Sequence, residues 1–171
     1  KVLSTQSVLN KKSLLNAYGR LSYSGVFAVY SAIVFPHRLV SDFIPERGVV
    51  YDMGCGFGIF SLFLASEKRG REIIGIDTSQ RRINAAQGAA KKLGIDNVRF
   101  VVADALEFEE PVCDGMVVNN LLHHLDGKPN QERFIRQVIK GIKPGGRIVI
   151  VDIQKKPLYK YLFTLLIDKI M

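Results

Sequence analysis

The chain has 171 residues, 47% of them hydrophobic, which is enough for one α/β domain around a single buried core. Its two cysteines form no Cys-x-x-Cys pair, which argues against a disulfide framework and a zinc site and suits a reducing cytoplasm. The formal net charge of +8 admits nucleic acid, an anionic membrane surface or an acidic substrate as partner, and a solvated basic surface accounts for it equally well.

The first 44 residues are expected to form a helical cap that precedes the core. Residues 1–20 are polar with apolar positions at helical spacing, and residues 26–35 are apolar on every side, so something must cover the helix that they form. The longest uncharged apolar run, residues 25–36, is shorter than the ~20 residues that cross a bilayer. We therefore expect a cytoplasmic protein, with contact to a membrane surface as an open alternative.

The pattern that organises the chain begins with an apolar, β-branched run at Val49, which predicts a buried parallel strand. Three alternating glycines let the backbone turn into a helix near Ile59, and without Cβ atoms they let a ligand touch the backbone and the free N–H groups. In a dinucleotide fingerprint the third glycine would stand at Ile59. Asp52, two residues before the first glycine, would repel a pyrophosphate but suits a ligand with an ammonium group. The glycines are Gly54, Gly56 and Gly58.

Strand and helix patterns alternate through the rest of the chain, which calls for a parallel sheet with right-handed crossovers. Thr78 and Ser79 can cap the helix that ends at Gly94, and Pro144-Gly145-Gly146 is taken as the stop of a later helix. The other expected elements are a helix at residues 59–67, strands at residues 72–77, 98–102 and 114–119, a loop at residues 123–130, a helix at residues 131–142 and a strand at residues 147–153.

Five segments in this order resemble the motifs of class I S-adenosylmethionine-dependent methyltransferases. Each stands at the end of a predicted strand or helix, which makes the set far more specific than the glycine loop alone. The resemblance covers roughly residues 44–153 and implies a three-layer α/β/α sandwich with a mostly parallel, Rossmann-like sheet and S-adenosylmethionine as cofactor. The segments are Asp52 to Gly58, Glu72 to Asp77, Val101 to Asp104, Asn119 to Leu125 and Ile142 to Gly146.

The resemblance implies that the methionine end of the cofactor lies over the glycine loop, with Asp52 near its ammonium group directly or through water. Asp77 would hold the ribose hydroxyls next to Thr78, and the spacing 77 − 58 = 19 from Gly58 agrees with the acid of other nucleotide-binding folds. An ordinary helix-capping turn is the alternative for Asp77. The loop residues expected to bind the cofactor are Gly54, Cys55, Gly56 and Gly58.

Two further strand ends carry expected cofactor contacts. Asp104 resembles the acid that accepts a hydrogen bond from the adenine amine, and Ala105 would lie against the ring. The alternative is that Asp104 caps a helix that begins at Ala105. Asn119 and Asn120 end the fourth strand, and either could face the cofactor.

His123 and His124 are the candidates for a catalytic proton carrier, since a histidine can take a proton from an amine or hydroxyl near neutral pH. Packing beneath the cofactor is the competing interpretation for both. A zinc site formed with Asp126 is disfavoured, because adjacent residues rarely converge on one metal.

The resemblance implies methyl transfer by in-line displacement, a step in which positioning supplies much of the acceleration. The expected acceptor is a small molecule or a lipid. Asn119-Asn120-Leu121-Leu122 stands where many base-amino methyltransferases have Asn-Pro-Pro-Tyr or Asp-Pro-Pro-Tyr. Two alternatives stay open: an rRNA or tRNA methyltransferase, and a non-catalytic cofactor-binding protein at a membrane surface or in an assembly.

The core domain is expected to span residues 45–171 and to be incomplete at its C-terminal end. Residues 157–171 are apolar on both sides of a helix, and the sequence stops before the antiparallel hairpin of two strands that the resemblance implies. Basic and aromatic residues together suit an anionic membrane interface. The lysines in or beside this segment are Lys155, Lys156, Lys160 and Lys169.

Overall fold

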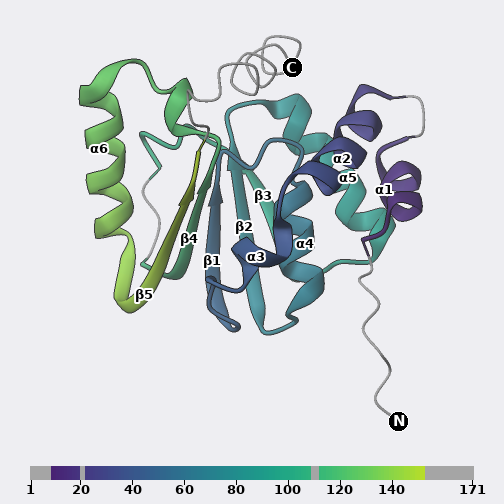
Figure 1. The fold of residues 1–171 in the computed structure, drawn as a ribbon, viewed down its shortest axis with the longest axis horizontal. Helices are drawn as coiled ribbons and strands as arrows, with labels where there is room; N and C mark the ends of the chain where they lie inside the picture. Colours follow the sequence, from purple (N-terminus) through teal and green to yellow (C-terminus); the bar gives the residue numbers. More distant parts are fainter. Residues whose placement is uncertain (1–8, 20–21, 109–111, 153–171) are drawn as a thin grey trace.

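The computed structural model describes residues 9–19, 22–108 and 112–152. Five strands form one parallel sheet in the order β3-β2-β1-β4-β5, with helices on both faces (Figure 1). The predicted α/β fold with a Rossmann-like parallel sheet is therefore confirmed. The strands are β1 (Gly48–Met53), β2 (Arg71–Asp77), β3 (Val98–Val102), β4 (Cys113–Asn119) and β5 (Ile142–Val151). The helices are α1 (Lys11–Tyr18), α2 (Tyr23–Val34), α3 (His37–Ser41), α4 (Ile59–Glu67), α5 (Gln80–Leu93), the 3₁₀ helix η1 (Leu122–His124) and α6 (Gly127–Lys140).

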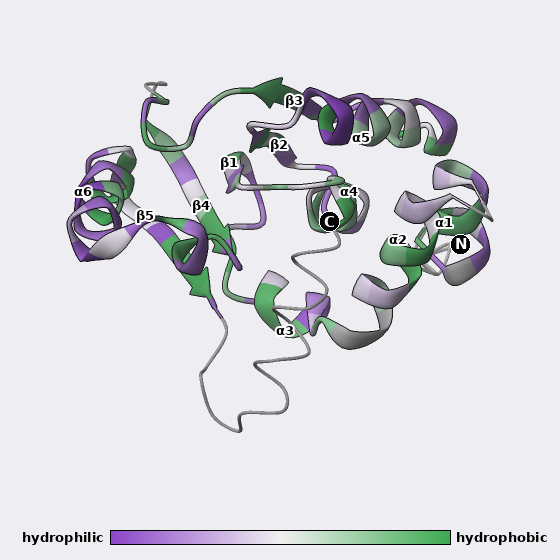
Figure 2. Ribbon diagram, turned by 90° about the horizontal axis from the view of Figure 1, so that it is seen from above, coloured by the Kyte–Doolittle hydropathy of each residue, from purple (hydrophilic) through white to green (hydrophobic). Residues whose placement is uncertain are grey.

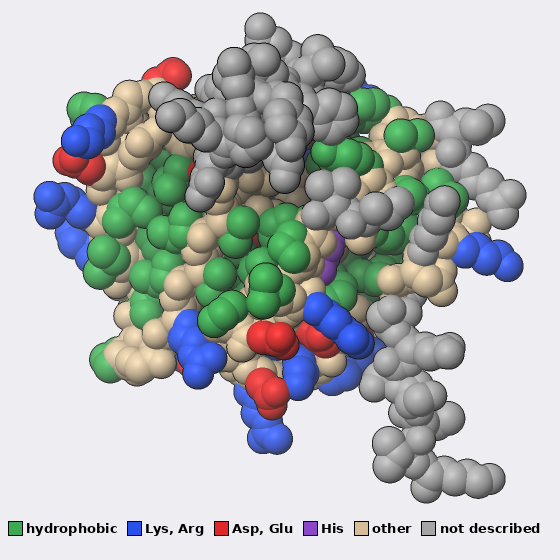
Figure 3. All heavy atoms as spheres, in the orientation of Figure 1, with side chains coloured by type: hydrophobic (Ala, Val, Ile, Leu, Met, Phe, Trp, Pro, Cys, Tyr) green, Lys and Arg blue, Asp and Glu red, His purple; other side chains and the backbone are tan. Residues whose placement is uncertain are grey.

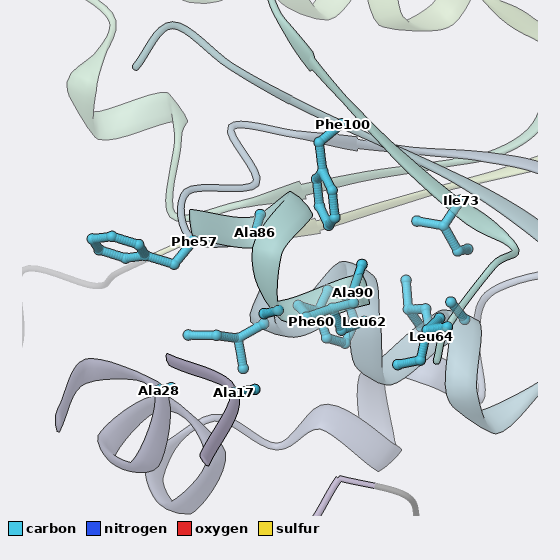
Figure 4. Packing of buried hydrophobic residues seen from close by; sticks show 14 of the residues in the cluster. Ala17, Ala28, Phe57, Phe60, Leu62, Leu64, Ile73, Ala86, Ala90 and Phe100 are labelled. Carbon is cyan, nitrogen blue, oxygen red and sulfur yellow. The ribbon is translucent and has the colours of Figure 1, made fainter. Parts of the chain in front are cut away.

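Different helices cover the two faces of the sheet, because successive residues of a strand point to opposite faces. Val50 and Ile73 are buried in the cluster that contains residues of α4 and α5, whereas Tyr51 and Ile74 are buried with Phe134 of α6. Figure 2 shows α6 on one side of the sheet and α1 to α5 on the other. Figure 4 shows the first cluster, in which Ala17 of α1 and Ala28 of α2 are labelled. The predicted three-layer sandwich is thus present.

The point at which the strand order reverses lies at β1. The chain runs from β1 outward to β2 and β3 and then returns to place β4 on the other side of β1. Met53, the last residue of β1, pairs with Ile76 of β2 and Val118 of β4, so the carboxyl ends of the three strands are level. In open α/β sheets, ligands bind in the crevice at this end and at this switch point.

Most predicted boundaries hold within one residue. The helix expected after the glycine loop is α4, and the third strand is β3, each with the expected ends. Ser79 caps α5 by accepting a hydrogen bond from the backbone N–H of Arg82, and Gly94 ends the helix in the left-handed conformation that glycine adopts readily.

The helix predicted at residues 131–142 begins and ends earlier than expected. α6 begins at Gly127, directly after Asp126, so much of the predicted loop at residues 123–130 is helical, in η1 and in the first turn of α6. Pro129 fits this first turn, where its missing N–H would have no partner within the helix. The start was missed because the first turn has no apolar position.

The strand predicted at residues 147–153 begins five residues earlier, at Ile142. Pro144-Gly145-Gly146 does not stop a helix but lies within β5, where the pairing with β4 changes register. Gly145 has a φ of 81°, which glycine adopts without strain, and an irregular pairing tolerates a proline that cannot donate to the ladder.

Helix α2 is less covered than its composition predicts. Ala28 of α2 is buried, but Val26 is 62% exposed and Tyr23 is 37% exposed. Among the described residues, no helix combines the length and the hydropathy that crossing a bilayer would require.

Arg71 joins the chain before β1 to α4. Its guanidinium is buried and donates to the backbone carbonyls of Pro45, Ser41 and Ile44 at 2.8, 3.1 and 3.2 Å. It also donates to the Ser41 hydroxyl at 2.9 Å and lies 3.5 Å from a carboxylate oxygen of Glu67. A buried charge is tolerated when it is hydrogen-bonded on all sides in this way.

Replacing Arg71 should therefore be far more harmful than replacing an exposed arginine. We expect Arg71→Met to lower the free energy of unfolding by about 3–5 kcal/mol, because several buried acceptors lose their donor at once. Arg69→Met is the control, since its ion pair with Asp96 is 66% and 86% exposed and should contribute less than about 1 kcal/mol. Urea unfolding measures both, and equal losses would contradict the role given to Arg71.

Candidate cofactor site

The three glycines of the loop between β1 and α4 all have left-handed backbone conformations, with φ values of 73°, 56° and 72°. Their surroundings differ. A Cβ atom on Gly58 would lie 2.5 Å from the Phe100 ring, and one on Gly54 would lie 2.9 Å from Leu121, so these two glycines are required for packing. A Cβ on Gly56 would meet nothing within 4 Å. Gly56 is therefore the glycine that faces open space.

Asp77 ties this loop to the end of β2. Its carboxylate accepts hydrogen bonds from the backbone N–H groups of Gly56 at 3.0 Å and Ser79 at 2.9 Å. The guanidinium of Arg82 lies 3.7 Å from the same carboxylate, and the Asp77 side chain is 6% exposed. The helix cap that was the alternative role for Asp77 is supplied by the Ser79 side chain. Asp77 thus holds two backbone turns at the strand ends.

A cleft of about 510 Å³ opens beside these groups, which is within the usual size range of small-molecule sites. It brings together six of the residues predicted from the sequence: Gly54, Asp77, Thr78, Asp104, Ala105 and His124. The other predicted residues do not line it: Asp52, Cys55, Gly56, Gly58, Asn119, Asn120 and His123. Eight lining residues were missed as site residues by sequence reasoning: Ile76, Arg82, Ala103, Leu106, Leu121, Leu125, Asp126 and Asn130.

Asp52 lies beneath the loop, with 1% of its surface exposed. Burial raises the pKa of its carboxyl group to about 6, and the negative charge of Asp77 adds to that rise. The Ser61 hydroxyl donates to it at 2.5 Å and opposes the shift. A buried carboxylate of this kind is stabilised by a nearby cation.

Cys55 contributes to the loop through its backbone. Its N–H donates to the carbonyl of Ile76 at 2.8 Å, and its sulfur lies over Gly75 of β2, 3.0 Å from where a Cβ atom would stand. Burial raises the pKa of the thiol well above its usual value, so the group stays protonated at neutral pH.

Asp104 is exposed, and its carboxylate accepts a hydrogen bond from the N–H of Leu106 at 2.9 Å. A turn follows it, so the helix that the alternative interpretation required does not begin at Ala105. Ala105 is 7% exposed and belongs to the core cluster on the α6 face.

Asn119 and Asn120 sit at the end of β4. Asn120 has a φ of 50°, the one positive value among the described non-glycine residues, and its backbone N–H donates to the Val151 carbonyl at 2.8 Å. The Asn119 side-chain oxygen is buried and has no hydrogen-bond partner within the described part of the chain. Strained and unsatisfied groups of this kind are concentrated at functional sites.

The two histidines have different surroundings. His124 is exposed to the cleft, whereas Nδ1 of His123 lies 2.6 Å from a carboxylate oxygen of Asp152, with both side chains less than one-fifth exposed. The two imidazole rings are 4.1 Å apart and tilted by 40°. Asp152 was missed because the fifth strand was expected to continue to residue 153, whereas it ends at Val151.

Arg82 could have been predicted as a residue of the cleft from its place one turn into α5 after Ser79.

The fold is that of a Rossmann-like methyltransferase domain, of the class that uses S-adenosylmethionine. Residues 45–166 match the family model described as a methyltransferase domain, which is 122 of the 171 residues. The chain belongs to this family.

Proteins similar to this chain carry several activities in their names. A carboxy-S-adenosyl-L-methionine synthase of Campylobacter jejuni is 27% identical over 115 residues, which are 67% of this chain and 48% of that protein. A ubiquinone biosynthesis O-methyltransferase of Leptothrix cholodnii is 31% identical over 111 residues, covering 63% and 45%. The crystal structure of the [4+2]-cyclase SpnF superposes with a TM-score of 0.61 at 27% identity, covering 67% and 42%. The chain spans about half the length of the curated relatives that it matches.

Gly56 and Gly94 form a matched pair for testing the loop. Both have positive φ values, 56° and 65°, and a Cβ atom on either would meet nothing within 4 Å. We expect Gly56→Ala and Gly94→Ala to lower stability alike, by about 1–2 kcal/mol. Only Gly56→Ala should weaken binding of S-adenosylhomocysteine, by about tenfold or more, which is ~1.4 kcal/mol. Calorimetry showing equal affinity in the two variants would remove Gly56 from the site.

Asp52 gives a prediction for the pH dependence of stability. Its pKa is raised from 3.8 to about 6, so ionisation of this carboxyl group destabilises the folded state. The resulting loss in the free energy of unfolding is absent below pH 3.8, grows as the pH rises to about 6 and is constant above that. Asp52→Asn should therefore raise the free energy of unfolding at pH 7.5 by about 1–3 kcal/mol and leave it nearly unchanged at pH 3.5. Urea unfolding at the two pH values measures this, and a variant that is less stable at pH 7.5 would contradict it.

Proposed function

We propose that this chain binds S-adenosylmethionine in the cleft and transfers its methyl group to a small-molecule or lipid acceptor by in-line displacement. The observation that carries the proposal is the Asp77 carboxylate, which holds the Gly56 N–H and lines a cleft of suitable size beside Asp104. The family supports the cofactor, and the switch point of the sheet supports its position.

In this proposal Gly54, Cys55, Gly56 and Gly58 carry the methionine end through their backbone. Asp77 and Thr78 take the ribose, Asp104 and Ala105 the adenine, and Asn119 or Asn120 meets the cofactor from β4. Asp52 would act from beneath the loop as a buried negative charge opposite the ammonium group, directly or through water.

The balance of charge in the cleft supports a cationic cofactor. Asp77, Asp104 and Asp126 line it, and Arg82 is the one arginine or lysine among the described lining residues. Oxygen acceptors and negative charge suit a sulfonium and an ammonium group, although the whole chain is basic. Arg82 would keep the Asp77 carboxylate oriented when the cofactor is absent.

For proton transfer we propose His124, because it lies on the cleft wall, with His123 packed against it. Asp152 would hold the His123 ring in one orientation through its 2.6 Å contact. A proton acceptor must be within hydrogen-bond reach of the acceptor group, and a cleft-lining imidazole meets that condition more readily than one behind it.

The acceptor class rests on two observations. After β4 the chain has Asn119-Asn120-Leu121-Leu122 rather than the Asn-Pro-Pro-Tyr or Asp-Pro-Pro-Tyr of many base-amino methyltransferases. One relative is named for a role in ubiquinone biosynthesis. The name of one similar protein, a carboxy-S-adenosyl-L-methionine synthase, favours a second candidate: a reaction that converts S-adenosylmethionine without methylating an acceptor.

We also propose that residues 1–44 form a cap and residues 45–171 the core domain. The buried hydroxyl of Tyr18 supports this, since it donates to the Phe57 carbonyl of the glycine loop at 2.6 Å and so places α1 next to the site. Contact with an anionic membrane through Lys155, Lys156, Lys160 and Lys169 remains a proposal, and these residues lie outside the described part of the chain.

The test is incubation with methyl-labelled cofactor and fractionated cell extract. We expect label in a small-molecule or lipid fraction. Label in RNA would favour the nucleic-acid alternative, and consumption of cofactor without labelled acceptor would favour the second candidate. No consumption, despite cofactor binding, would indicate a non-catalytic binding protein.

Asp77→Ala should abolish most of this turnover and weaken S-adenosylhomocysteine binding by about 1.5–3 kcal/mol, through loss of hydrogen bonds to a charged acceptor. Asp96→Ala is the control, because Asp96 is exposed and pairs with Arg69 at the opposite end of β2. Calorimetry that shows unchanged affinity in Asp77→Ala would exclude Asp77 from the ribose site.

A further inference from the structure

A second hollow lies between the cap helices and α4. It has a volume of about 630 Å³ and shares no lining residue with the cofactor cleft among the described residues. Figure 3 shows apolar side chains gathered on the face of the molecule that carries α3. Eight of the ten lining residues are apolar: Leu9, Leu14, Ala32, Phe35, Pro36, Leu39, Ile59 and Phe63. The two polar ones are His37 and Arg38.

His37, the first residue of α3, has only 7% of its surface exposed. Its Nδ1 lies 2.8 Å from the Phe35 carbonyl oxygen, which also accepts the His37 backbone N–H at 2.8 Å. A carbonyl oxygen can only accept, so Nδ1 carries the proton of the ring. Nε2 is then a hydrogen-bond acceptor.

Three aromatic rings surround this imidazole. The centroids of Phe35, Phe60 and Phe63 lie 4.9, 5.5 and 5.2 Å from that of His37. These rings offer no O–H or N–H donor, and Nε2 has no hydrogen-bond partner within the described part of the chain. Burial lowers the pKa of the ring, with the Phe35 carbonyl opposing that shift, so the imidazole is neutral at pH 7 and keeps its lone pair.

A buried acceptor without a donor is rare in folded proteins and calls for a partner from outside the described part of the chain. His37 lines the hollow, which otherwise has the apolar lining of a ligand site with few polar groups. Nε2 is itself covered, so an entering group has to displace the side chains over it. Leu39, on the wall of the hollow, is 60% exposed.

We propose that this hollow binds an apolar molecule that carries a hydroxyl group, with the hydroxyl donating to Nε2 of His37 and the apolar body lying along the walls of α2, α3 and α4. A phenol or a long-chain alcohol has this chemistry. A carboxylate does not, because it brings no donor for a neutral acceptor. The site is separate from the cofactor cleft, so it does not depend on the proposed function.

The probes are para-pentylphenol and its methyl ether, which have the same apolar body and differ in the hydroxyl donor. Calorimetry on the full chain should show the phenol binding about three- to tenfold more tightly than the ether, as one net neutral hydrogen bond allows. His37→Phe should remove this preference while retaining an aromatic ring at the position. Equal affinity for both probes in the unaltered chain, or a preference that persists in His37→Phe, would overturn the role of the hydroxyl.

Two variants of α2 locate the binding. Ala32→Phe should weaken both probes at least about fivefold by filling the hollow, whereas Val26→Phe on the same helix, exposed and outside the lining, should not. Saturating S-adenosylhomocysteine should leave the affinity of the phenol unchanged. Competition by S-adenosylhomocysteine would place the phenol in the cofactor cleft, and no binding of either probe would mean that water or the chain itself fills the hollow; either result overturns the proposal.

Discussion

The hydrogen bond from the Gly56 N–H to the Asp77 carboxylate is the constraint on which the site depends. It joins the turn after β1 to the turn after β2, and it can form because parallel pairing sets Met53 level with Ile76. The left-handed conformation of Gly56 aims the N–H at the carboxylate and leaves the opposite side of the loop open. The flanking glycines are needed for another reason, since side chains of β3, α5 and the turn after β4 pack directly against them.

The electrostatics of the cleft differ from those of the whole chain. A net charge of +8 invites a search for anionic partners, but the carboxylates at the strand ends form an acidic site within a basic molecule. Asp52 extends this pattern beneath the loop, where burial makes its negative charge costly unless a cation lies nearby. The stability lost to a buried acid at a ligand site is a common trade between folding and function.

The proposed cap is attached to the rest of the fold by polar groups as well as by apolar packing. Arg71 holds the chain that leads into β1, and Tyr18 reaches the glycine loop itself. The same attachment creates the second hollow, because the short helix α3 packs its histidine among aromatic rings and leaves a wall of apolar side chains beside it. Packing of the cap thus bears on both sites.

The sequence by itself determined the order of the core strands and of their connecting helices along the chain, the glycine loop and the acids at the strand ends, because hydrophobic period, capping residues and glycine conformations are local properties. Even the ends of α4, α5 and β3 followed from them. It misplaced α6 and β5 because a polar first turn and an irregular pairing leave no periodic signal. The pairing of His123 with Asp152, the approach of Arg82 to Asp77 and the burial of His37 were decided by the tertiary structure alone. Contacts of these kinds depend on how separate elements pack, and no pattern within one segment encodes that geometry.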